Sequence, residues 1–541
     1  MPSLIIHGHF YQPPRENPWT GVIEEQPSAA PFHDWNERIH FECYRPNAFV
    51  RIAGAGSDEQ FVNNYELINF NFGPTLLSWL ERNHSHTYER IREADRLSVS
   101  QRNGHGNAIA QAYGHAILPL CNDRDLRTQI RWGLADFRYR FGREAESLWI
   151  PETACNDRVM SALVDEGLRY AILAPHQAKR VSSRSDSDDY RTANGSERDT
   201  EAGRMPADRP QDAGAPRWRE ADETTIDTSI SYRYVGRDDP NKSIAVFFYD
   251  GATSRAIAFE KLLSSSLELV DAFAQSGDGK QMINIATDGE TYGHHFKFGD
   301  LCLAHALTEE APARGFKVTN HGEYLNNHPP ECEIEINNGP NGEGTSWSCT
   351  HGIGRWTRDC GCHTGGELGW NQKWRTPLRG ALDFLRDANI PYFEATQGPL
   401  FFDPWQTRDD SIRLVLNPTK SREEFLLNHA GRWLSRDEQE QALTYLELQR
   451  MLLLMYTSCG WFFNDISGIE TIQILKYAAR AIDLMNQLGL PSVRDRFLEI
   501  LGEAKSNRRE MATGADVFRQ FVEPSNPQFS GRKLSTEAVL G

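Results

Sequence analysis

Short apolar segments that end in polar or charged residues recur along the first 300 residues of the chain. Such a segment is typical of a strand that is buried in a sheet and opens toward solvent at one end. Segments with the periodicity of amphipathic helices lie between them, for example at 123–141, 157–167 and 255–275. Strands that alternate with helices predict an α/β fold with a parallel sheet or barrel. The predicted strands are residues 4–6, 66–72, 148–150, 170–174, 244–249 and 281–285.

Helical periodicity dominates the second half of the chain, at 377–388, 437–456, 466–488 and 493–505. These segments predict a helical C-terminal domain. The expected organisation is therefore a strand–helix domain at 1–345, a Gly- and Trp-rich connecting region at 346–430, a helical domain at 431–523 that contributes to the active site, and a loose tail at 524–541.

One segment of the first domain differs sharply from its surroundings. Between Val181 and Ile226 there is no Val, Ile, Leu or Phe. A segment of this composition cannot bury enough apolar surface to offset the entropy of ordering it. We therefore expect a disordered surface insertion at about 182–225, without a chemical role.

Charge and composition exclude several classes of partner and location. The chain has 541 residues and a net charge of −17, without a basic run, which argues against nucleic acid and anionic membrane surfaces as partners. No apolar run approaches the roughly 20 residues of a membrane span, and residues 1–7 lack the basic start of a signal peptide. Nine cysteines, most of them scattered singly, are typical of reduced thiols. We therefore expect a cytoplasmic protein.

Acidic side chains follow two of the predicted strands. Asp288 and Glu290 come after the strand at 281–285, and Glu152 comes after the strand at 148–150. Pro151 stops the latter strand, because proline has no N–H for continued pairing. In parallel sheets and barrels, catalytic groups lie on the loops after the carboxyl ends of strands. The acids are therefore candidates for one site.

The first strand ends in a second group of polar residues. His7 and His9 lie on the same face, because side chains alternate along a strand, and Gln12 and Trp19 follow them. The two histidines can hydrogen-bond a hydroxylated ligand, bind a metal, or be core histidines without a ligand. The pattern alone leaves these three interpretations open.

A cysteine- and histidine-rich segment follows the first domain. It contains Cys349, His351, Cys360, Cys362 and His363. A zinc site is one interpretation, but the spacing lacks a pair of Cys-x-x-Cys sequences. A Gly- and Trp-rich loop packed near the active site is the interpretation that we favour, so no metal is predicted.

Five short motifs follow one another along the chain. They are His7-Gly8-His9 with Gln12-Pro13, the stretch around Gly104-His105-Gly106, Trp149-Ile150-Pro151-Glu152, Asp288-Gly289-Glu290-Thr291-Tyr292-Gly293, and the turn from Trp461 to Gly468. In this order the segments resemble the motifs of glycoside hydrolase family 57. The second segment departs from the family pattern, because the usual acid is missing and His105 stands nearby, which leaves substrate choice open.

The resemblance implies an incomplete (β/α)7 TIM-like barrel followed by a helical C-terminal domain. It also implies an enzyme that acts on an α-linked oligo- or polysaccharide, such as an α-glucan, without a cofactor. In the family, the third segment supplies the nucleophile and the fourth the general acid. The resemblance therefore assigns Glu152 as nucleophile and Asp288 as acid and then base.

Two carboxyl groups of this kind suit retaining cleavage of a glycosidic bond by double displacement. One must be ionised to attack the anomeric carbon, and the other must be protonated to donate to the leaving oxygen. Other polar and aromatic residues are expected to bind the sugar by hydrogen bonds or ring stacking. These substrate-binding candidates are His7, His9, Gln12, Trp19, His105, Trp149, Glu290, Trp461 and Asp465.

Two alternatives use the same residues differently. A metal-dependent carbohydrate hydrolase, such as a polysaccharide deacetylase or an α-mannosidase, could hold its ion with His7, His9 and Asp288. A non-catalytic glycan-binding protein could keep the fold, although the presence of both Glu152 and Asp288 argues against it.

Overall fold

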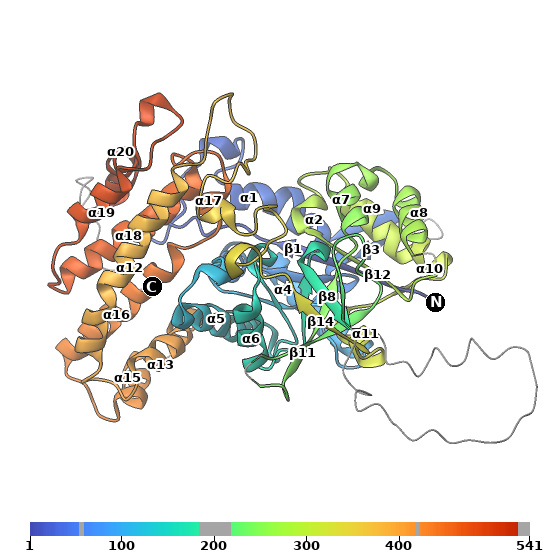
Figure 1. Cartoon of the computed structure of the whole chain (residues 1–541), viewed down its shortest axis with the longest axis horizontal. Coiled ribbons are helices and arrows are strands. Elements are labelled where there is room, and N and C mark those ends of the chain that lie inside the picture. Colours follow the sequence, from blue (N-terminus) through green and yellow to red (C-terminus); the bar gives the residue numbers. More distant parts are fainter. Residues whose placement is uncertain (54–58, 183–217, 238, 278, 418–420, 528–541) are drawn as a thin grey trace, which may run out of the picture.

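The computed structural model describes residues 1–53, 59–182, 218–237, 239–277, 279–417 and 421–527 (Figure 1). Most of the insertion expected at 182–225 lies outside the described residues, as does the predicted tail beyond residue 527. The start of that tail is packed, because Asn526 is buried and donates to Asp483. No helix within the described ranges is long and apolar enough to cross a membrane.

Strand β1 (Ser3–Phe10) is buried along its whole length. It pairs in parallel with β12 (Met282–Asp288) on one side and with β4 (Asn69–Phe72) on the other. The register places His9 opposite Asp288. A histidine and an acid from distant parts of the sequence thus meet at the carboxyl ends of neighbouring strands.

Parallel pairing continues beyond β4 through short strands and single bridges. The spatial order is β12, β1, β4, β5, β6, β7 and β11. A hydrogen bond from Asp250 N to Asn284 O (2.6 Å) links the end of β11 back to β12. The carboxyl ends of these strands therefore converge at one end. The further strands are β5 (Ala110–Gln111), β6 (Leu148–Trp149), β7 (Tyr170–Leu173) and β11 (Ser243–Phe248).

Helices in the connections between strands pack apolar faces against this part of the core. The helix expected at 255–275 is two helices, because Lys261 adopts a left-handed conformation (φ 63°) and Ser265 caps a new helix by accepting from Glu268 N. The principal helices are α3 (Pro74–Asn83), α4 (Ser85–Gln101), α5 (Asp123–Phe141), α6 (Asp157–Asp165), α7 (Gly251–Phe259), α8 (Ser266–Ser276) and α9 (Gly299–His305).

A mixed extension continues from β11. Strand β10 pairs antiparallel with β11 and in parallel with β14, and antiparallel pairing then runs from β14 through β8 to β9. Strands β8 and β9 flank the undescribed segment 183–217. The bounds are β8 (Ala178–Ser182), β9 (Trp218–Glu220), β10 (Ser231–Val235) and β14 (Cys332–Ile336).

The C-terminal region is helical and lies to one side of the strands (orange to red in Figure 1). Its long helices share one core, which includes Leu382, Leu448, Ile474 and Phe497. The expected α/β fold with a helical C-terminal region is thus confirmed. The first of these helices begins at 375, inside the expected connecting region, so the boundary at 431 stays a prediction. The helices are α12 (Arg375–Gln397), α16 (Arg436–Leu454), α18 (Ile469–Gln487) and α19 (Arg494–Leu501).

Two glycines in helix interiors test this packing. A Cβ on Gly133 in α5 would lie 2.0 Å from the carbonyl oxygen of Gln111 in β5, whereas a Cβ on Gly380 in α12 would meet nothing closer than Ile500 at 3.7 Å. Alanine is favoured over glycine in helices by about 1 kcal/mol, so Gly380→Ala should raise the thermal unfolding midpoint. Gly133→Ala should lower stability by about 1–3 kcal/mol, because α5 must move away from β5. An equal rise of the unfolding midpoint in both variants, measured by calorimetry, would contradict the close contact between Gly133 and Gln111.

Candidate active site

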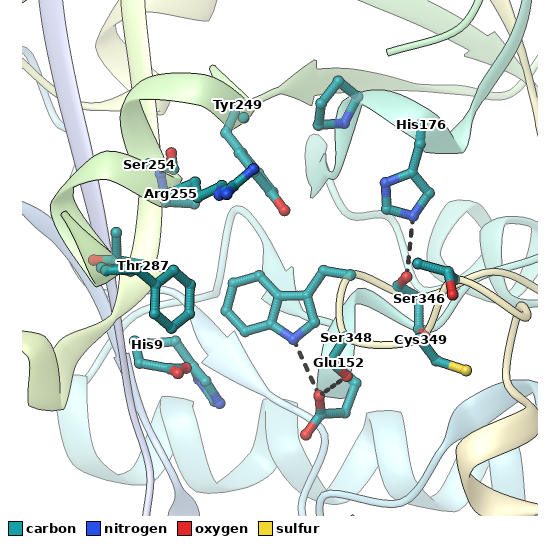
Figure 2. A pocket seen from close by; sticks show the side chains of 18 of the residues that line it. His9, Glu152, His176, Tyr249, Ser254, Arg255, Thr287, Ser346, Ser348 and Cys349 are labelled. Carbon is teal, nitrogen blue, oxygen red and sulfur yellow. Dashed lines mark hydrogen bonds between the residues drawn. The ribbon is translucent and has the colours of Figure 1, made fainter. Parts of the chain in front are cut away.

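A cavity of about 1820 Å³ opens at the carboxyl ends of the strands. Its walls include His9 from β1, Glu152 from the turn after β6 and Asp288 from β12. A loop around Trp347 and the aromatic turn that contains Phe463 also form part of the wall. Figure 2 shows His9, Glu152, Tyr249 and Ser348 around the central space. The strand–helix part and the helical region therefore both contribute to one cavity.

Glu152 occupies a backbone conformation that is unusual for its residue type. It has φ 58° and ψ 20°, and Thr153 also has a positive φ of 46°. The N–H of Trp347 supports this turn by donating to Glu152 O (3.1 Å) and to Thr153 Oγ1 (3.0 Å). Left-handed non-glycine residues are costly and cluster at functional sites. Here the conformation places the Glu152 side chain on the cavity wall.

The Glu152 carboxyl group is held by two donors from the same loop. Trp347 Nε1 (3.1 Å) and Ser348 Oγ (2.7 Å) both donate to Glu152 Oε2 (dashed lines in Figure 2). Burial raises the pKa of Glu152, while these donors and the nearby Arg355 act in the opposite direction. Hydrogen bonds of this kind favour the ionised form.

Asp288 has a different environment. Its side chain reaches solvent through the cavity, and no hydrogen bond to its carboxyl group is present among the described residues. Desolvation by the surrounding protein, followed by the negative charge of Glu152, raises the pKa of Asp288 to about 7. The two acids are thus electrostatically coupled, and Asp288 is the one that retains its proton near neutral pH.

Glu290 is a third acid on the cavity wall, two residues beyond Asp288. Its Oε1 accepts from Tyr44 Oη (2.6 Å) and from Tyr11 N (3.0 Å). Burial, only partly offset by the Tyr44 bond, raises the pKa of Glu290 to about 8. Glu290 therefore fixes the segment after β1 as well as bordering the cavity.

A chain of polar side chains lies beneath the site. Asn71 Nδ2 donates to Gln111 Oε1 (2.7 Å) and to His9 Nδ1 (2.9 Å), which leaves the His9 proton on Nε2. His9 Nε2 lies 3.3 Å from His115 Nε2, and His115 Nδ1 lies 2.7 Å from Ser458 Oγ. Burial holds the pKa of both histidines far below the ordinary value. They are therefore neutral, and the chain joins β4 to the helical region.

Two predicted substrate-binding residues lie behind the cavity wall. His7 donates to Asn71 Oδ1 (2.9 Å) and stacks on Trp149 with ring centroids 4.6 Å apart. Trp149 is buried and also stacks against His9 at 5.2 Å. Neither His7 nor Trp149 lines the cavity, so both support His9 from below.

The structure places four further predicted binding residues away from the cavity, because their side chains have partners in the protein interior. Trp19 donates to Asp483 (2.8 Å), and Trp461 is buried against the backbone of Arg375. Asp465 accepts from Ser467, Ser506 and Asn507, and His105 binds Glu146 (2.9 Å). The predicted residues that do line the cavity are His9, Gln12, Glu152, Asp288 and Glu290.

Several residues of the site had no specific prediction. Trp347 and Ser348 contact the predicted nucleophile but belong to a loop that the sequence shows only as Gly- and Trp-rich. Tyr249 follows β11 and lines the cavity, and the only signal for it was its position at a strand end. Phe462 and Phe463, next to Trp461, face the cavity in its place.

Side chains that could hold a metal occur at two places in the described residues. One group is Glu37, His40 and His84, and the other joins three cysteines to a histidine near residue 350. Neither group contains His7, His9 or Asp288. The hypothesis of a catalytic metal on these three residues therefore has no support from the geometry.

Comparison with known proteins agrees with this arrangement. A family model described as glycosyl hydrolase family 57 matches residues 5–337, and one described as a domain of unknown function matches residues 370–535. Alpha-amylase 1 of Dictyoglomus thermophilum is 25% identical over 107 residues, which are 20% of this chain and 15% of that protein. The chain thus aligns with only a small part of this curated relative.

One solved structure extends the likeness in fold to most of the chain. An exo-type maltose-forming amylase from Pyrococcus sp. ST04 superposes with a TM-score of 0.64 at 14% identity, covering 92% of this chain and 82% of that one. A branching enzyme from Pyrococcus horikoshii gives a TM-score of 0.49 at 14% identity, covering 99% and 98%. The family match spans more than half of the chain, and the chain therefore belongs to glycosyl hydrolase family 57.

Proposed function

We propose that the protein is a retaining glycoside hydrolase or transglycosidase that acts on an α-linked glucan. The observation that carries this proposal is the pair of coupled acids on one cavity wall, of which Glu152 is held by donors and Asp288 has a pKa near 7. The run of parallel strands from β12 to β11 supports the incomplete (β/α)7 barrel that the family resemblance implies.

The mechanism follows from the two environments. Asp288 donates its proton to the glycosidic oxygen while the Glu152 carboxylate attacks the anomeric carbon, which breaks the bond and forms a glycosyl-enzyme. Asp288, now ionised, takes a proton from water or from a sugar hydroxyl as that oxygen attacks the same carbon and releases Glu152. Two inversions leave the anomeric configuration unchanged.

The shape and lining of the cavity favour a glucan chain over a small glycoside. Its volume exceeds the roughly 300–1,000 Å³ of pockets for small ligands. Tyr249, Trp347 and Phe463 offer aromatic surface along it, and Arg15 and Glu470 offer polar groups. The similar proteins named above include an alpha-amylase and a maltose-forming amylase, which agrees with this substrate class.

Substitution of the two acids tests the proposal. Glu152→Gln and Asp288→Asn should each reduce kcat/KM on α-glucan oligosaccharides by at least about 10³-fold. Glu220→Gln, which changes an exposed acid at the cavity rim, is the matched control and should stay within about twofold of wild type.

Azide should restore turnover to Glu152→Ala with formation of a glycosyl azide, because a small anion can replace the missing nucleophile. Proton NMR of the first product should show the anomeric configuration of the substrate. Activity that survives both acid substitutions, or a product of inverted configuration, would overturn the mechanism.

The pH profile should follow the two environments. Activity requires protonated Asp288 and ionised Glu152, so kcat/KM should fall as the pH rises above about 7, the pKa of Asp288. Ser348→Ala removes a donor that favours ionised Glu152, which raises the pKa of Glu152 and should move the acidic limb to higher pH. Ser28→Ala, on the cavity wall but without a bond to Glu152, should leave both limbs in place. An acidic limb that Ser348→Ala does not move would contradict the role of this donor.

A further inference from the structure

Four potential metal ligands converge beside the active site. The side chains of Cys349, His351, Cys360 and Cys362 place one ligand atom each within 4.8 Å of all the others. Cys349 Sγ lies 3.9 Å from Cys360 Sγ and 3.7 Å from Cys362 Sγ, and Cys362 Sγ lies 3.5 Å from His351 Nδ1. Three sulfurs and one imidazole nitrogen thus surround a single point.

The spacing of these atoms matches tetrahedral zinc. With Zn–S bonds of about 2.3 Å and a Zn–N bond of about 2.0 Å, tetrahedral angles put two sulfurs about 3.8 Å apart and a sulfur and nitrogen about 3.5 Å apart. The observed separations of 3.7, 3.9 and 3.5 Å are all within about 0.1 Å of these values. Disulfide-bonded sulfurs lie about 2.05 Å apart, and all three cysteines are free.

The surroundings suit a bound ion with thiolate ligands. Three thiolates and one Zn²⁺ carry a net charge of −1, and the buried Arg375 compensates it with Nη1 4.0 Å from Cys360 Sγ and 3.0 Å from Cys362 O. Such outer contacts orient ligands and tune a metal site.

We propose that Cys349, His351, Cys360 and Cys362 bind one Zn²⁺ in a closed structural site. Soft thiolates with one imidazole select zinc over magnesium or calcium, and four protein ligands leave no position for a catalytic water. The zinc in this site would take no part in the reaction proposed for Glu152 and Asp288.

The position of the ion also gives it a role in orienting Glu152, and this role rests on the proposed function. Cys349 directly follows Ser348, and Thr345 pairs with Cys155 on the other side of the loop. An ion on Cys349 therefore fixes the loop whose Trp347 and Ser348 donate to Glu152. At the far end, Cys362 is tied to α12 through Arg375. The zinc thus holds the donor loop between the two parts of the molecule, as a positioning element.

Metal content tests the site without reference to activity. The full chain, purified under reducing conditions and dialysed against metal-free buffer, should retain about one Zn²⁺ per chain in mass spectrometry for metals. Replacement by Co²⁺ should give the intense visible absorption of a tetrahedral site with thiolate charge-transfer bands. Cys360→Ser/Cys362→Ser should lower zinc affinity by more than about 100-fold, whereas Cys302→Ser, a free cysteine outside the cluster, should keep the ion.

The outcomes separate this proposal from the proposed function. Metal-free protein whose three thiols all titrate, a disulfide within the cluster, or a double variant that keeps its zinc would overturn the zinc site, whatever the activity. Glu152→Gln should bind zinc as wild type does. In the zinc-free double variant, the acidic limb of the pH profile should move upward as in Ser348→Ala. A zinc-free variant with an unchanged pH profile would refute the positioning role of the zinc but not the zinc site itself.

Discussion

The site depends on how the chain holds a left-handed turn at Glu152 and Thr153. Pro151 ends the strand, and the next two residues adopt positive φ values that cost about 1–3 kcal/mol each. Both are held from outside by the N–H of Trp347. The turn at Glu152 and Thr153 depends on hydrogen bonds from the N–H of Trp347. The loop around Trp347 depends in turn on the acceptors that these two residues present. The orientation of Glu152, the proposed nucleophile, therefore depends on a contact between segments that are distant in the sequence.

The difference between the two acids arises from the same constraint. Glu152 receives two donors because the loop is there, whereas Asp288 faces open cavity and the negative charge of Glu152. Donors stabilise a carboxylate, and desolvation with a like charge stabilises a carboxylic acid. The donors of this loop therefore oppose the burial that raises the pKa of Glu152, and no such donor to Asp288 is present among the described residues. Glu290, bonded to Tyr44, adds a third acid that fixes the segment after β1.

Local signals in the sequence predict part of this arrangement. The acids at strand ends, Glu152 and Asp288, follow from apolar runs that stop at proline or at polar residues, and both lie on the cavity. The tryptophans do not follow from such signals, because a ring that stacks on sugar and a ring that fills a core look alike in sequence. Trp149 and Trp461 are buried, while Trp347 contacts Glu152. Only packing between distant segments distinguishes them.

The helical region is part of the site because polar contacts cross the junction at several depths. Ser458 is hydrogen-bonded to His115, which lies beneath His9. Cys459 and Phe463 form part of the cavity wall. Arg375 contacts the cysteine cluster through Cys362 O. These contacts join the base of the cavity, its wall and the donor loop to the same helices. A shift of the helical region would therefore move the donors of Glu152 as well as the cavity wall. The shape of the cavity and the orientation of Glu152, the proposed nucleophile, are therefore coupled through this junction.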